Sequence, residues 1–434
     1  LAAVRASERA HDDALSGLAS QIKTRHANAV AVFNPLGRSR TDVVIIRALN
    51  LAGGNIAAVD DASGKSVPCQ WLDADRLCFV APDVPALGYR TFHLVASGAS
   101  GANSSVASGI GRPASGLRSE NKFYRLKLDP ATGAIISLVD VELGRELAST
   151  NGPHSFNQYI YQWFGEPNGG ASWSRPPANA KISVERGPVA SVTSVRAEAD
   201  GVNWLEQTIT VYNDIKRIDF ELRMDKKPSG RSLADYNANN MRGKESVFVA
   251  LPFDIPDFKA VYQAAGGGVA EPVRDQFKGT ATAFYSVQHF ADISNDKFGV
   301  TVSPIDCALV EFDHPRSDAL SRARPGGEKY FEKRMEYPKR SSLFLYLLGN
   351  MFTTNIRVDQ RGEHVFRWAL RSHAGDWRTG EADRFGEAVN QPLIARFVNP
   401  RGGRMPEGAR SFASVDAGNV SIGTIKLAEW NGDG

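Results

Sequence analysis

The sequence predicts a mainly β protein, in which one N-terminal helix precedes a small β-sandwich and a large antiparallel one. Three observations support this. Helical periodicity is confined to the first residues, whereas short apolar segments with alternating side chains recur from residue 29 onward. A run of small, flexible residues separates two strand-rich regions. No repeat typical of a propeller or solenoid is found between the strands.

The helix is expected over residues 2–26. Its apolar stripe, at helical spacing, consists of Val4, Leu15, Leu18 and Ile22. A lone helix cannot bury such a stripe by itself, and no other long helical segment follows. We therefore expect Leu15, Leu18 and Ile22 to be exposed or in contact with another chain.

The first β region has the strand spacing of a small sandwich. Its expected strands cover residues 29–33, 41–48, 56–59, 67–72, 76–81 and 89–95. A hairpin turn at residues 73–75 would place Gln70 opposite Cys78. Cys69 would then lie opposite Phe79, and the two sulfurs would point to opposite faces. With Cys307, the chain has an odd number of cysteines, so we expect free thiols and no zinc site formed by them.

The second β region follows the flexible run at residues 96–116 and is expected to form the large sandwich. Its main strands are expected at residues 123–128, 135–139, 183–194, 203–212, 217–224, 246–251, 298–302, 342–348 and 364–371. Residues 226–244 and 316–333 are expected to be long loops. The predicted organisation is a helix, a small sandwich, a linker, a large sandwich and a terminal β segment, at 1–28, 29–97, 98–118, 119–400 and 401–434.

The ends of the chain resemble cuts inside a longer polypeptide. Residues 420–429 alternate like a strand, and residues 431–434 read Asn-Gly-Asp-Gly, a hairpin-turn signal without a returning strand. Together with the unpartnered helix, this predicts sequence missing at both ends.

The composition excludes several classes of partner. Hydrophobic residues make up 42% and charged residues 23%, as in ordinary globular proteins. The 51 basic and 48 acidic residues leave a net charge of +3 without a basic stripe, so no nucleic-acid partner is expected. No apolar run approaches the roughly 20 residues that cross a bilayer, so no membrane partner is expected. A homo-oligomer remains compatible with the sequence.

An ordered set of short segments resembles the region after the catalytic barrel in family 38 α-mannosidases. The segments are AVFNPL at 31–36, PALGY at 85–89, SENKFYR at 119–125, DPATG at 129–133, LGREL at 143–147, QRG at 360–362, FRW at 366–368 and HAGDW at 373–377. The resemblance implies that the large sandwich is galactose mutarotase-like and that the N-terminal helix remains from a helical bundle.

The resemblance also implies a function. Family members hydrolyse α-mannosides with retention, using two carboxylates and a zinc ion held by an N-terminal barrel and bundle. None of those motifs occurs here. The predicted role is therefore the C-terminal β portion of such an enzyme, which braces the catalytic barrel and forms one wall of the sugar cleft. No catalytic or metal residue is predicted in this chain, zinc is expected in the catalytic domain, and this segment alone is expected to be inactive.

The best carbohydrate-contacting candidates are Gln158, Tyr159 and Tyr161. Aromatic faces pack on sugar CH groups, and glutamine and tyrosine supply directional hydrogen bonds. The family resemblance implies that this region approaches the active site. The alternative is that alternation places both tyrosines on one half-buried strand face.

Other readings remain open. The chain could be a free-standing carbohydrate-binding or structural module. A mutarotase-like epimerase would need a histidine acid with a carboxylate base, for which His289 near Asp292 is a weak signal. At residues 373–377, a turn capped by Asp376 is favoured over a site. His11 and its neighbouring aspartates are expected to be helix surface, since positions two apart do not share a helix face.

Overall fold

The structure is a computed structural model. The residues that it describes are 2–48, 51, 55–96, 117–166, 170–238, 240–277, 280–315, 336–351, 358–399, 403–418, 420, 422, 423 and 425. The predicted linker at 98–118 and the predicted loop at 316–333 lie almost wholly outside this part, as do most of 420–429 and all of 431–434. The described residues of 420–429 form no strand.

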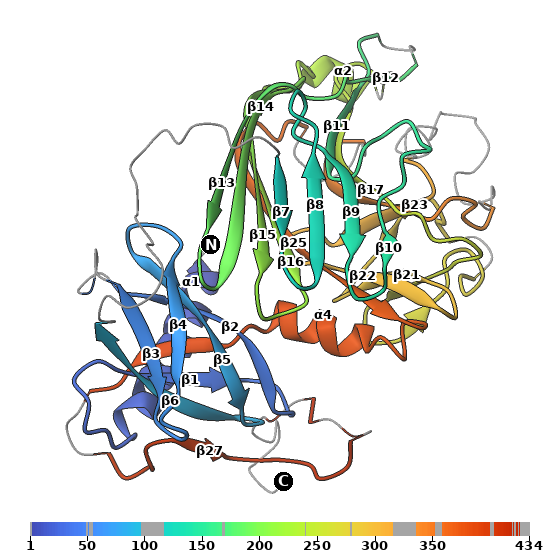
Figure 1. Cartoon of the computed structure of the whole chain (residues 1–434). Helices are drawn as coiled ribbons and strands as arrows, with labels where there is room; N and C mark the ends of the chain where they lie inside the picture. The colour runs from blue at the N-terminus through green and yellow to red at the C-terminus, as the bar shows by residue number, and fades with distance from the viewer. Residues whose placement is uncertain are drawn as a thin grey trace, which may run out of the picture. The chain divides into compact units, whose positions relative to one another are not determined.

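The chain divides into two compact units. The first comprises Leu1–Ser108, Gly187–Ala190 and Gln391–Gly434, and the second comprises Gly109–Arg186 and Ser191–Asn390. In the described residues both units are built mainly from antiparallel strands, so the predicted mainly β class is confirmed (Figure 1).

The first unit contains one helix and a single curved sheet in the described part of the chain. The elements are α1 (Ala2–Ser20), β1 (Ala29–Asn34), β2 (Arg40–Arg47), β3 (Ile56–Asp60), β4 (Ser66–Trp71), β5 (Arg76–Val84), β6 (Gly88–Ala96), β26 (Ile394–Phe397) and β27 (Ala409–Ser411). The strand order is β2-β5-β4-β3-β6-β1-β26, with β27 on β6. Apolar residues of β1, β2, β5 and β6 share one core, so the sheet curls over on itself.

The β4–β5 hairpin has the predicted register. Gln70 lies opposite Cys78, and Cys69 lies opposite Phe79. Both cysteines are free thiols, as is Cys307. Burial raises the pKa of each of these thiols to about 12, so all three are protonated at neutral pH.

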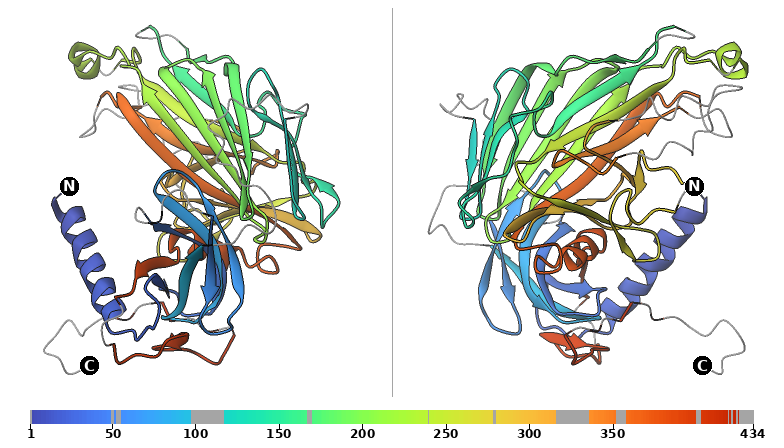
Figure 2. Two further views of the ribbon diagram at one scale, coloured as in Figure 1. Left: turned by 60° about the vertical axis from the view of Figure 1, so that its left-hand side comes forward. Right: turned by 90° about the vertical axis from the view of Figure 1, so that its right-hand side faces the viewer.

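The expectation that Leu15, Leu18 and Ile22 are exposed or in contact with another chain is wrong for two of these three residues. Leu15 and Ile22 are buried in a small core with Tyr89, although Leu18 is 39% exposed. The helix also ends at Ser20, six residues earlier than expected. Its partner is the outer side of the small sheet, which includes β26 from a distant part of the sequence (Figure 2).

The second unit begins with a four-stranded sheet of order β10-β9-β8-β7. Its described strands are β7 (Arg118–Glu120), β8 (Tyr124–Leu128), β9 (Ile135–Asp140) and β10 (Arg145–Glu146). A six-stranded sheet has the order β12-β11-β17-β24-β23-β20. Its described strands are β11 (Gln158–Trp163), β12 (Ser172–Trp173), β17 (Glu245–Pro252), β20 (Tyr285–Ser286), β23 (Leu309–Phe312) and β24 (Ser342–Gly349).

A nine-stranded sheet completes the large sandwich, in the order β13-β14-β15-β16-β25-β22-β21-β18-β19. Its described strands are β13 (Ala178–Arg186), β14 (Ala190–Glu198), β15 (Val202–Tyr212), β16 (Ile218–Lys226), β18 (Lys259–Gln263), β19 (Val269–Ala270), β21 (Ala291–Ser294), β22 (Phe298–Pro304) and β25 (Gly362–Ala374). One apolar core draws side chains from all three sheets of this unit, which therefore pack face to face.

Several elements of the second unit differ from expectation. The single strand expected at 183–194 is a hairpin of β13 and β14, because Gly187-Pro188 turns the chain. The long loop expected at 226–244 contains the short helix α2 (Leu233–Asn237). Helix α4 (Ala382–Asn390) was not expected, and it buries Phe385 and Val389 against Ala369.

Candidate functional site

The predicted carbohydrate residues lie on β11, between β12 and β17. Gln158 is 5% exposed, Tyr159 is fully buried and Tyr161 is 9% exposed. The Tyr159 hydroxyl donates to the Asp200 carbonyl at 3.0 Å, and Gln158 Oε1 accepts from the Ser155 amide at 2.9 Å. These polar groups are therefore used inside the protein, and their contact with sugar stays a prediction.

Tyr161 belongs to a buried ionic network. Glu245 Oε2 accepts from the Tyr161 hydroxyl and from Lys226 Nζ, each at 2.7 Å. Lys226 is 1% exposed. Its Nζ lies 5.2 Å from the Tyr161 ring centroid and also donates to the Lys227 carbonyl. Burial and then the Glu245 charge raise the pKa of Tyr161 well above its ordinary value. Tyr161 thus remains a protonated donor, and the network stabilises the strands that carry it.

The opposite face of β11 presents a different set of groups. Gln162 pairs in register with Ser246 on one side and Trp173 on the other. Side chains directly opposite each other share a face of the sheet, so these three form a row. Gln162 is fully buried, yet neither atom of its amide has a hydrogen-bond partner in the described structure. At one end of the row, Trp173 is 41% exposed.

Of the groups that carbohydrates contact, this row exposes an aromatic ring, whereas the Gln162 amide and the Ser246 hydroxyl are buried. The Ser246 hydroxyl lies 3.0 Å from the Tyr346 hydroxyl, which adds a second one beside it. Nearby along the chain, burial and then the Arg231 charge lower the pKa of Lys244 to about 8. Gln162 lies on the same strand as Tyr159 and Tyr161 but on its opposite face, as the alternation of side chains along β11 requires.

The other predicted candidates are structural in this fold. His373 Nε2 lies 2.8 Å from Asp292 Oδ2, and both are buried. Asp292 therefore pairs with His373, a residue far along the chain, and not with His289. Asp376 accepts from the Thr379 amide at 3.0 Å, which confirms the predicted capped turn. His11 is exposed on the helix surface, as expected.

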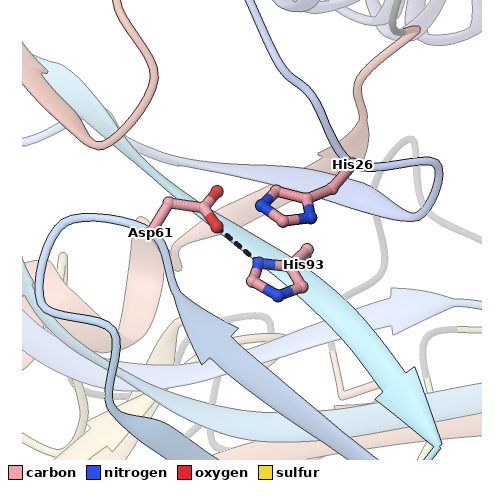
Figure 3. A group of neighbouring side chains, drawn as sticks. All are labelled: His26, Asp61 and His93. Atoms are coloured by element: carbon pink, nitrogen blue, oxygen red, sulfur yellow. Dashed lines mark hydrogen bonds and ion pairs between the residues drawn. The ribbon is translucent and has the colours of Figure 1, made fainter.

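The described residues contain one group of three side chains with the chemistry to hold a metal ion: His26, Asp61 and His93 (Figure 3). Their ligand atoms all lie within 4.8 Å of one another. The group belongs to the first unit and was not predicted. Its members are 35 and 32 residues apart, on separate elements, so no short sequence motif contains all three.

The comparisons with known proteins concern both units. Residues 119–306 match the family described as Glycosyl hydrolases family 38 C-terminal domain. No curated protein matches the sequence. None of the described helices is long and apolar enough to cross a membrane.

Two solved structures from Enterococcus faecalis share the fold. An alpha-mannosidase from strain V583 matches 89% of this chain and 48% of its own, with 12% identity and a TM-score of 0.58. A protein in the Glycosyl Hydrolase Family 38 matches 91% of this chain and 50% of its own, with 11% identity and a TM-score of 0.57. A galactose mutarotase related enzyme from Lactobacillus acidophilus matches 60% of this chain at 10% identity, with a TM-score of only 0.33. The chain spans about half the length of the two Enterococcus structures.

Proposed function

We propose that this chain is the β portion of a retaining α-mannosidase-type glycosidase, because residues 119–306 match the family described as Glycosyl hydrolases family 38 C-terminal domain. In this proposal the catalytic carboxylates and the zinc ion are supplied by another part of the enzyme. The β portion braces that catalytic part and contributes one wall of the sugar cleft. Its carbohydrate partner is an α-mannoside.

The family match is the observation on which this proposal rests, and the length of chain that shares its fold with an alpha-mannosidase supports it. The chain is similar over almost its whole length to about half of an alpha-mannosidase. A retaining mechanism needs two carboxyl groups about 5–5.5 Å apart, flanking the scissile bond. The buried Tyr161 hydroxyl of the large sandwich is instead bound by a protein partner, Glu245, which suits a supporting role.

The proposed sugar-facing group is Trp173, which lies at the exposed end of a row that continues into the protein with the buried Gln162 and Ser246. The exposed indole offers a face for sugar CH groups. The same row supports a second candidate function, a carbohydrate-binding module without a catalytic part.

Two measurements test the proposal. The purified chain, supplied with zinc, should not hydrolyse an aryl α-mannoside, and clear turnover would contradict the assignment of the catalytic groups to another part. Calorimetry with mannobiose should detect weak binding that Trp173→Ala reduces at least about fivefold, since stacking on an aromatic ring is worth roughly 1–3 kcal/mol in comparable contacts.

The matched control is Phe277→Ala, which removes another exposed aromatic ring of the same unit and should leave binding unchanged. Absence of mannobiose binding would reject the wall role and leave a purely structural domain. In the full-length enzyme, a higher KM for the Trp173→Ala variant would favour the cleft wall over the independent module.

A further inference from the structure

The small sheet brings three potential ligands together from three segments. His93 lies on β6 and is paired in register with Ala29 of β1 and Val59 of β3. Asp61 follows Val59 by two residues, at the turn that leaves β3, and His26 precedes Ala29 by three. The pairing of β6 with both neighbours therefore places His26 and Asp61 beside His93 (Figure 3).

Asp61 is the unusual member of this cluster. Its Oδ1 lies 2.5 Å from His93 Nδ1, but its Oδ2 is buried and has no hydrogen-bond partner in the described structure. The Asp61 side chain is only 1% exposed. A buried carboxylate oxygen without a donor is costly, and the great majority of such atoms in proteins are paired. A bound cation would supply the missing partner.

The two histidines add the nitrogen ligands. Their rings are stacked, with centroids 3.6 Å apart and planes inclined by 4°. Both residues are only partly exposed, so an ion that they hold would be partly shielded from solvent. A neutral imidazole binds a metal ion through one of its two ring nitrogens.

We propose that His26, Asp61 and His93 form a binding site for a divalent transition metal ion, best matched by zinc. Two imidazoles and one carboxylate are ligands that zinc prefers, and a water molecule would complete its four-coordinate shell. The site would bind metal whatever the function of the large sandwich.

Metal binding requires a small local movement. A metal ion lies in the plane of each imidazole that binds it, so two parallel rings cannot both bind the ion as they stand. His26 lies in the segment between α1 and β1, whereas His93 is fixed in a central strand. We therefore expect the His26 ring to turn and His93 to stay. The bound ion would then tie the α1–β1 segment to β3 and β6.

The test uses the whole chain, freed of metal by a chelator and dialysed. Calorimetric titration with Zn²⁺ should give one site per chain, and Zn²⁺ should raise Tm by about 5 °C at saturation, because a ligand that binds only the native state stabilises it. Titration with Co²⁺ should give the visible absorption of a four-coordinate site. His26→Gln should weaken zinc binding by more than the roughly 10–100-fold loss that outer-shell substitutions cause.

The control is His11→Gln, which removes an exposed histidine beside an aspartate, 4.0 Å away, on α1. It should bind zinc as the unchanged protein does. His26 lies outside the helices and strands, so the His26→Gln variant is expected to fold, and its Tm in the chelated state verifies this. Absence of a one-to-one zinc site, or zinc binding that is equally strong in His26→Gln, would overturn the proposal.

Discussion

Glu245 in the second unit and Asp61 in the first are both carboxylates enclosed among potential donors, and the two clusters differ in how completely the carboxylate is satisfied. In the large sandwich, Glu245 Oε2 receives hydrogen bonds from both Lys226 and Tyr161. In the small unit, Asp61 Oδ1 lies 2.5 Å from His93 Nδ1, whereas Asp61 Oδ2 has no hydrogen-bond partner in the described structure. The first cluster is closed within the protein, whereas the second has a place for one more partner.

The difference separates a structural network from a candidate ligand site without any knowledge of function. Burial alone does not make the distinction, because Glu245 and the Asp61 side chain are both almost inaccessible. A closed network contributes stability that is lost when one member is removed. An open one contributes little until its partner binds. Substitutions at Lys226 and Asp61 test this contrast directly, and a third, at Lys244, tests a buried cation next to Glu245 in the sequence.

The largest effect is expected from Lys226→Met. The substitution leaves the Glu245 carboxylate buried without its cation, which typically costs about 3–5 kcal/mol. The double variant with Glu245→Leu should recover much of that loss, because no buried charge remains. Urea unfolding of the single and double variants measures both. A loss below about 1 kcal/mol in the single variant would show that the network is not closed as described.

An intermediate effect is expected from Lys244→Met, which removes a buried cation whose pKa is lowered to about 8. Between pH 8 and the ordinary lysine value near 10.5, the unfolded chain binds one more proton than the native chain, so native stability rises with pH. The variant should be more stable at pH 7, on the order of 1–2 kcal/mol after allowance for solvent screening. That advantage should shrink as the pH rises from 8 towards 10.5. An advantage that does not change with pH would contradict the lowered pKa.

The smallest effect is expected from Asp61→Asn in the presence of a chelator. Asparagine keeps an oxygen that can accept from His93 and replaces an unpartnered charged oxygen with a neutral amide. The free energy of unfolding should change by less than about 1 kcal/mol, in contrast to the effect at Lys226. Thermal unfolding of the chelated protein measures it. A loss above about 3 kcal/mol would mean that Asp61 is already fully satisfied and would remove the contrast.

Local patterns predicted much of the fold. The alternation of apolar and polar residues predicted most of the strands. The turn between Asp73 and Asp75 predicted the register of the hairpin that contains Cys69 and Cys78. The errors have local causes as well. The single strand expected at 183–194 is wrong because Gly187-Pro188 interrupts it. Helix α4 is not expected from the sequence, although Ala382, Phe385 and Val389 have helical spacing.

The remaining features depend on contacts between distant residues, which a single sequence does not show. Leu15 and Ile22 are buried partly because strand β26, more than 370 residues later, lies beside the helix. The partners of Tyr161 are 65 and 84 residues away along the chain. The cluster around His93 exists because β6 pairs with both β1 and β3.

The position of β26 has a consequence for biosynthesis. Strand β1, with the sequence AVAVFN, pairs on one side with β6 and on the other with β26, which is translated some 360 residues later. At roughly 5–20 residues per second, a ribosome needs on the order of 20–70 seconds to reach it. During that time β1 is an apolar edge open to aggregation, so the nascent chain is expected to need a chaperone there.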